Sequence, residues 1–169
     1  RASGTRTGLP GVDTELSILA DLPWPRVELL RGNDANAQAL HQMGPQARRL
    51  HFAVHGINDP QSPMDSALML HDAQGRPQPL AVWDIFESLR LQAELVVLAA
   101  CDTAPGASVS DDGWMGLTRA FQFAGAERVI SALWPVDDRA TAGLMSAVHR
   151  RLANGIEPAR ALAQAQRQM

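Results

Sequence analysis

The sequence predicts an α/β domain in which a mostly parallel β-sheet lies between helices. Apolar segments of strand length alternate along the chain with segments whose apolar residues recur at helical spacing. The apolar segments show no polar alternation, which is typical of parallel strands covered on both faces. The chain has 169 residues, 46% of them hydrophobic, which fits one domain with a substantial core.

The first elements are predicted from local signals at the N-terminal side. Residues 1–8 have no periodicity and are expected to form a tail or linker ahead of a single domain over residues 9–169. A helix that starts near Asp13 or Thr14 should end before Pro23. Residues 27–30 are apolar except for Glu28 and predict a short strand.

The middle of the chain predicts two further strands and two helices. Asn33 or Asp34 is the expected N-cap of a helix that ends near residue 43. Residues 48–54 predict a buried strand, and a second, shorter strand is expected over residues 67–71. A turn should follow at residues 72–75, and then a helix over residues 81–89.

The remaining segments repeat the same alternation. The run ELVVLAA is the most apolar in the chain, and a helix that ends at Gly125 is expected after it. The predicted order is a strand over 94–100, a helix from about 114 to 124, a strand over 129–133, a helix over 137–153 and a helix from 157 to the end.

Composition excludes several classes of protein. The chain has 15 basic and 18 acidic residues and no basic stripe, so direct binding to nucleic acid is not expected. No apolar run approaches the ~18 residues of a membrane span, so no membrane contact is expected either. Lysine is absent, a bias that we attribute to a GC-rich and therefore bacterial genome. Because Cys101 is the only cysteine, no internal disulfide can form, which favours the cytoplasm.

Two strand ends carry residues that could perform chemistry. His55 and Gly56 follow one predicted strand, and Cys101 follows another. Parallel strands end at the same edge of a sheet, so the two strands can bring an imidazole and a thiol together. An imidazole can accept the thiol proton and return a proton to the leaving group, which is the chemistry of a cysteine peptidase.

Each of these residues also has a purely structural interpretation. A single cysteine after an apolar strand is commonly a small buried side chain, and a loop histidine commonly bonds to backbone. The joint placement of His55 and Cys101 favours the catalytic interpretation. No Cys, His or acidic cluster has the spacing of a zinc site, and no glycine-rich phosphate loop is present, so neither metal nor cofactor is expected.

Several phrases in register resemble the CHAT domain, a caspase-like cysteine peptidase family of clan CD that is distantly similar to separase. The resemblance runs in order from about Leu9 to the end of the chain. The phrases are LHFAVHG (Leu50 to Gly56), SALML (Ser66 to Leu70), ELVVLAACDT (Glu94 to Thr103), LTRAFQFAGAERVISALWPVDD (Leu117 to Asp138) and RAT (Arg139 to Thr141).

The resemblance implies a role for individual residues. Cys101 takes the position of the family's nucleophile and His55 that of its general acid and base. The backbone N–H groups of Gly56 and Cys101 are then expected to form the oxyanion hole. Asp138 and Asp137 occupy the place where separase-like enzymes carry an acid that lines the P1 pocket, although both could instead cap a helix.

The resemblance also implies a fold and an activity. The fold is a caspase-like three-layer arrangement, and the activity is hydrolysis of peptide bonds in protein substrates through a thioester acyl-enzyme. The alternative is a catalytically silent scaffold or interaction module of the same fold. Family members are often attached to tetratricopeptide repeats, so a regulatory repeat domain is an expected partner. The chain begins with Arg1 and stops before the family's last strand, so it is expected to be part of a longer protein.

Overall fold

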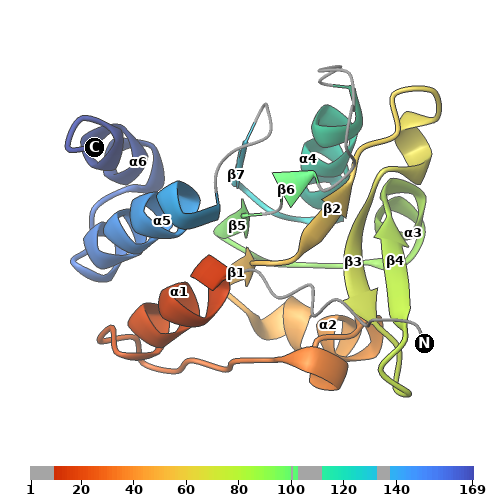
Figure 1. Ribbon diagram of the computed structural model, residues 1–169, viewed down its shortest axis with the longest axis horizontal. Helices are drawn as coiled ribbons and strands as arrows, with labels where there is room; N and C mark the ends of the chain where they lie inside the picture. Colours follow the sequence, from red (N-terminus) through yellow and green to blue (C-terminus); the bar gives the residue numbers. More distant parts are fainter. Residues whose placement is uncertain (1–9, 100, 103–111, 133–137) are drawn as a thin grey trace, which may run out of the picture. The chain divides into compact units, whose positions relative to one another are not determined.

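The computed structural model of the protein describes residues 10–99, 101–102, 112–132 and 138–169. The chain forms two compact units (Figure 1). The smaller unit comprises Arg1–Leu29 and Asp137–Met169, and the larger unit comprises Leu30–Val136. The predicted tail over residues 1–8 lies outside the described residues, and the single-domain interpretation of residues 9–169 stays a prediction.

The larger unit contains a three-stranded parallel sheet in the order β1 (Arg49–Phe52), β5 (Leu95–Leu98) and β7 (Val129–Ser131). The central strand β5 is buried along its whole length, with no residue more than 2% exposed. This burial explains the unbroken apolar run, because a strand with a neighbour on each side and a cover on each face meets no water. The α/β class with mostly parallel strands is confirmed.

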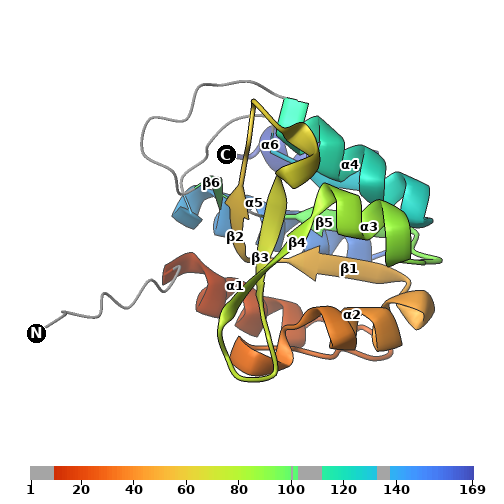
Figure 2. The same cartoon turned by 90° about the vertical axis from the view of Figure 1, so that its right-hand side faces the viewer.

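A second, four-stranded sheet follows in the order β4 (Pro77–Ala81), β3 (Ala67–His71), β2 (His55–Ile57) and β6 (Cys101–Asp102). Strand β3 pairs antiparallel with both β2 and β4, whereas β2 and β6 are parallel. Figure 2 shows β2, β3 and β4 side by side.

Two segments of the chain pass from the first sheet into the second: β1 is followed by β2, and β5 is followed by β6. Strand β2 begins three residues after β1 ends, and β6 begins three residues after β5 ends. Between them the Ala99 N–H donates to the Phe52 carbonyl oxygen at 2.9 Å. The parallel contact of β1 with β5 therefore continues, beyond a short irregular step, into the parallel contact of β2 with β6.

The described part of the larger unit has three α-helices: α2 (Ala37–Met43), α3 (Val82–Ser88) and α4 (Asp112–Ala124). Three short 3-10 turns accompany them at Gly32–Asp34, Gly44–Gln46 and Pro63–Asp65. Asn36 is the N-cap of helix α2, and its Oδ1 accepts the Ala39 N–H at 2.8 Å. The expectation that Asn33 or Asp34 caps this helix is wrong, because both belong to the preceding 3-10 turn.

One apolar cluster holds the larger unit together. Helices α3 and α4 pack against each other, and the Phe52 ring on β1 lies 5.3 Å from the Phe121 ring on α4. A close contact of this kind buries two aromatic side chains at once, which dominates core energetics. The most deeply buried members are Leu68, Val82, Ile85, Leu89, Ala93, Val96, Leu117, Ala120 and Phe121.

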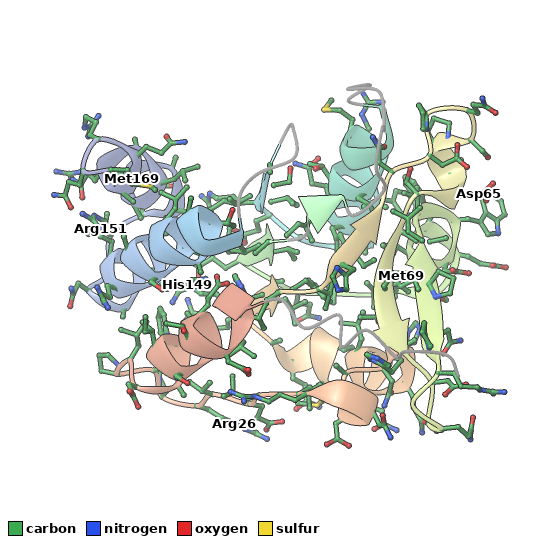
Figure 3. All side chains as sticks on the ribbon, viewed as in Figure 1. Arg26, Asp65, Met69, His149, Arg151 and Met169 are labelled. Atoms are coloured by element: carbon green, nitrogen blue, oxygen red, sulfur yellow. The ribbon has the colours of Figure 1, made fainter. Side chains whose placement is uncertain are left out.

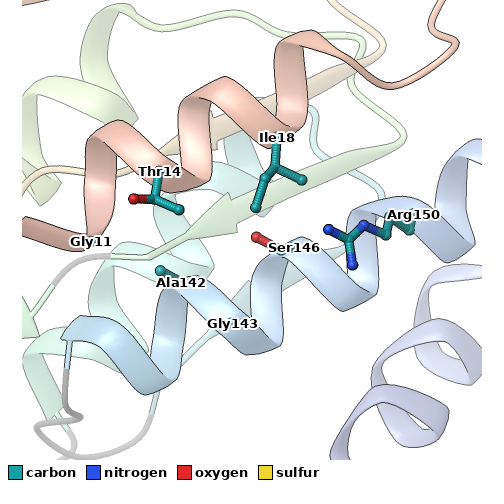
Figure 4. A pocket seen from close by; sticks show the side chains of 7 residues that line it. All are labelled: Gly11, Thr14, Ile18, Ala142, Gly143, Ser146 and Arg150. Atoms are coloured by element: carbon teal, nitrogen blue, oxygen red, sulfur yellow. The ribbon is translucent and has the colours of Figure 1, made fainter.

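The smaller unit is built from α1 (Pro10–Ala20), α5 (Asp138–Ala153) and α6 (Pro158–Gln166). Helix α5 packs against both others. Small side chains along the contact of α1 with α5 leave a groove of about 490 Å³ (Figure 4). Its lining residues are Gly11, Thr14, Ile18, Ala142, Gly143, Ser146 and Arg150.

Three expectations need correction. The sequence pattern places His149, labelled in Figure 3, on the surface of a predicted helix, where it is expected to be solvated; on α5 it is only 4% exposed. Residues 27–30 form no strand, since every one is exposed and pairs with no neighbouring strand. Helix α1 begins at Pro10, before the expected start at Asp13 or Thr14. Proline is favoured in the first turn of a helix, where its missing N–H is not needed.

Candidate active site

The backbones of the two predicted catalytic residues lie at paired register positions on neighbouring parallel strands. His55 is the first residue of β2 and Cys101 the first residue of β6, and the two are register partners. They are 46 positions apart in sequence, so the fold brings them together. The expected adjacency of the two strand ends is therefore found in the backbone; the Cys101 side chain lies outside the described residues.

The next register pair places the predicted oxyanion-hole glycine. Gly56 pairs with Asp102, one step beyond His55 and Cys101. Gly56 is buried, and on its other side it pairs with Leu68 of β3. A residue held between two strands has a fixed backbone, which suits a group that must point at one position.

The sequence predicts this juxtaposition for a physical reason. The segments before His55 and Cys101 pair in parallel, with Phe52 opposite Leu98, so both chains leave the sheet in the same direction. On each chain two residues separate the first strand from the next one. Because the two connections have equal length, the register is kept, and His55 pairs with Cys101.

The His55 side chain is half-buried, in contrast to the exposed His41 on α2. Partial burial of a side chain restricts the imidazole to fewer rotamers than full exposure would allow. Such a group can serve as a general acid and base only where it is both held and accessible.

The residues expected to bind substrate belong to the other unit. Asp138 is the first residue of α5, in the smaller unit, and Asp137 lies outside the described residues. Their assignment to a P1 pocket stays a prediction. The position of Asp138 at a helix start fits the capping alternative equally well, because the first turn of a helix favours a negative charge.

A small junction next to β2 was not anticipated from the sequence. The Ser66 hydroxyl accepts the Asp59 N–H at 2.9 Å, just beyond the end of β2. The nearby Gly113 on α4 lies so close that a Cβ there would meet the Ser66 Oγ at 2.2 Å. Ser66 is the first residue of the sequence phrase SALML, so the sequence drew attention to its segment. Its contact partners lie in other segments of the chain, which only the folded structure identifies.

Within residues 10–99, 101–102, 112–132 and 138–169, no three His, Cys, Asp or Glu side chains gather as a metal site would need. Among the same residues, no helix has the length and apolar character to cross a bilayer.

Comparison with known proteins places the chain in a family. The model of the CHAT domain matches residues 2–169. Mouse tetratricopeptide repeat protein 28 is 43% identical over 77 residues, and the human protein of the same name is 39% identical over 77 residues. The match covers 46% of this chain but 3% of either relative, so the chain spans a small part of their length. Since the family model covers nearly all of the sequence, the chain belongs to the CHAT domain family, a caspase-like family of clan CD.

Proposed function

We propose that the protein is a cysteine endopeptidase in which Cys101 is the nucleophile and His55 the general acid and base. The observation that supports this most is the register pairing of the two residues on parallel strands. Membership of a caspase-like family gives the same chemistry an independent basis.

The proposed reaction has two steps. The Cys101 sulfur attacks the scissile carbonyl carbon while His55 accepts the thiol proton. The carbon–nitrogen bond then breaks, and the imidazolium of His55 gives its proton to the departing amine. Water, deprotonated by His55, attacks the remaining thioester, which releases the acid product and restores the thiol.

The oxyanion of each tetrahedral intermediate needs preorganised donors. The backbone N–H groups of Gly56 and Cys101 are proposed for this task, and removal of one such donor typically costs 10²–10³ in kcat. Gly56 has no side chain, so a substrate carbonyl can approach its backbone closely. Neither metal nor cofactor is required by the chemistry.

Substrate and control are part of the proposal. Asp138, or its neighbour Asp137, is proposed to favour a cationic P1 residue, because a guanidinium binds a carboxylate through two parallel hydrogen bonds. The relatives are tetratricopeptide repeat proteins by name, which supports a repeat domain as regulatory partner. A protein substrate, a bacterial source and a cytoplasmic location complete the proposal.

The decisive experiment combines labelling and turnover on the full-length protein. An electrophilic peptide should form a covalent adduct on Cys101, located by peptide mapping. A peptide library should then be cleaved by the wild type, with kcat/KM lower by about 10³-fold or more in Cys101→Ala and His55→Ala. His41→Ala is the matched control, since His41 is exposed on α2.

The alternative scaffold role gives a different result. A silent module would fold normally, form no adduct at Cys101 and cleave no peptide in either wild type or variant. Equal activity in the wild type and Cys101→Ala would remove the proposed nucleophile.

A further inference from the structure

Ser66 lies where four segments of the larger unit meet. It is 0% exposed and stands directly before β3. Its hydroxyl accepts the Asp59 N–H at 2.9 Å, and its carbonyl oxygen accepts the Val82 N–H at the start of α3 at 2.9 Å. A buried hydroxyl with a backbone partner fixes that partner, because the N–H would otherwise lose its hydrogen bond.

The segment fixed by Ser66 is the one that carries the proposed catalytic histidine. Ile57 of β2 pairs with Ala67, so Ser66 lies at the register position opposite Asn58. The Asp59–Ser66 hydrogen bond therefore closes the end of the β2–β3 pair. His55 and Gly56 lie at the other end of the same short strand, within four residues of the closure.

Gly113 brings helix α4 into contact with this junction. An ideal Cβ at this position would lie 2.0 Å from the Asn58 Oδ1 and 2.2 Å from the Ser66 Oγ. Both distances are far below van der Waals contact, so only glycine lets α4 approach this closely. Residues on either side of 103–111 therefore contact the segment around β2: Asp102 pairs with Gly56, and Gly113 lies against Asn58, the residue after β2.

We propose that Ser66 is a positioning residue, which together with the close approach of Gly113 holds the His55–Gly56 segment in register with Cys101. This inference rests on the proposed peptidase function and adds two residues that do not touch the reacting atoms. A misplacement of reacting groups by about 1 Å can cost about 10²-fold in rate, so a hydrogen bond four residues away can affect turnover.

The test compares two serines of the same loop in the full-length protein. Ser66→Ala removes the acceptor for Asp59 with little change in volume, and Ser62→Ala, whose hydroxyl donates to Asp65, is the matched control. Ser66→Ala should lower kcat about 10- to 100-fold with KM within about threefold. Ser62→Ala should stay within twofold of the wild type.

Two readouts separate positioning from a merely structural role. The pH profile of Cys101 alkylation should change in Ser66→Ala, because the distance from thiol to imidazole changes. The His55 imidazole resonance should shift in the same variant, while the Asp59 amide exchanges its hydrogen faster. Unchanged kcat, alkylation profile and His55 resonance in folded Ser66→Ala would overturn the proposal.

A second pair of variants tests the glycine. Gly113→Ala should lower the melting temperature and kcat together, whereas Gly116→Ala, on the same helix with its nearest Cβ contacts at 3.4 Å, should do neither. Wild-type behaviour of Gly113→Ala contradicts the close approach. If the wild type itself forms no adduct, the peptidase function fails, but the His55 resonance in Ser66→Ala still decides the positioning role.

Discussion

Gly125 packs directly on the backbone of Leu91, so that a Cβ at position 125 would come within 2.1 Å of the Leu91 carbonyl oxygen. The φ angle of Gly125 is +116°, and the Leu91 N–H donates to the Ala124 carbonyl oxygen at 2.6 Å. The end of α4 is thereby joined to the segment that leads into β5. A side chain would break this joint both sterically and through its φ requirement.

Gly125→Ala should therefore destabilise the protein by about 2 kcal/mol or more, because strain and a backbone clash add. Gly155→Ala is the control: its φ is +79°, but a Cβ there meets nothing within 4 Å. It should cost about 1 kcal/mol. Urea unfolding of both variants measures the difference in their free energies of unfolding. Equal losses of stability would show that the close contact with Leu91 adds no energetic penalty.

Two phenylalanines on α4 should respond in opposite ways to truncation. Phe121 is 0% exposed and contacts Phe52, whereas Phe123 is 67% exposed. Phe121→Ala leaves a cavity and should cost about 3–5 kcal/mol. Phe123→Ala loses only its ring contact with Phe86, at 5.1 Å between centroids, and should cost about 1 kcal/mol. Denaturant midpoints of the two variants decide the matter, and similar midpoints would contradict the burial of Phe121.

The turn between β3 and β4 should make stability depend on pH in acid. Hydrogen bonds from the Arg76 backbone, followed by its side chain, hold the pKa of Asp72 below its ordinary value of 3.8. A lowered pKa contributes stability above the ordinary value, and this contribution disappears as the pH falls through the folded-state pKa. The difference in unfolding free energy between wild type and Asp72→Asn should be constant near pH 7 and vanish in strong acid. A difference that stays constant down to about pH 2 would assign the effect to something other than the charge.

The P1 prediction can be decided by a change of substrate. If Asp138 reads a cationic side chain, Asp138→Asn should lower kcat/KM about tenfold or more for an Arg substrate and much less for a matched Leu substrate. Asp137→Asn tests the neighbour in the same assay. Equal losses on both substrates, or a wild type that prefers Leu, would leave Asp138 as a helix cap.

Long periodic or unbroken patterns predicted their elements well. The strand over residues 67–71 is found with those bounds, and the helix that ends at Gly125 is found as α4. The meeting of His55 and Cys101 was inferred because parallel strands end at the same sheet edge, and the two residues are register partners in the structure. These features depend on local signals or on one simple rule of sheet topology.

The failures arise where a partner decides the outcome. Residues 27–30 have the composition of a strand, but a strand needs a neighbour, and these residues have none. Strand β4 was missed because Pro77 and Pro79 argue against a strand. The Ser66 junction brings Ser66 close to Gly113, nearly 50 positions later in the chain, and no local sequence pattern predicts this contact.

The prolines of β4 also determine how this sheet meets other molecules. Strand β4 lies at the end of the order β4-β3-β2-β6, so one of its sides has no partner among the strands of this sheet. Pro77 and Pro79 pair with His71 and Met69 of β3, yet a proline has no N–H to give. Their nitrogens must therefore face outward. A strand from another chain that paired with this edge would lack two backbone N–H donors. This rim resists the strand-by-strand growth through which exposed sheets aggregate.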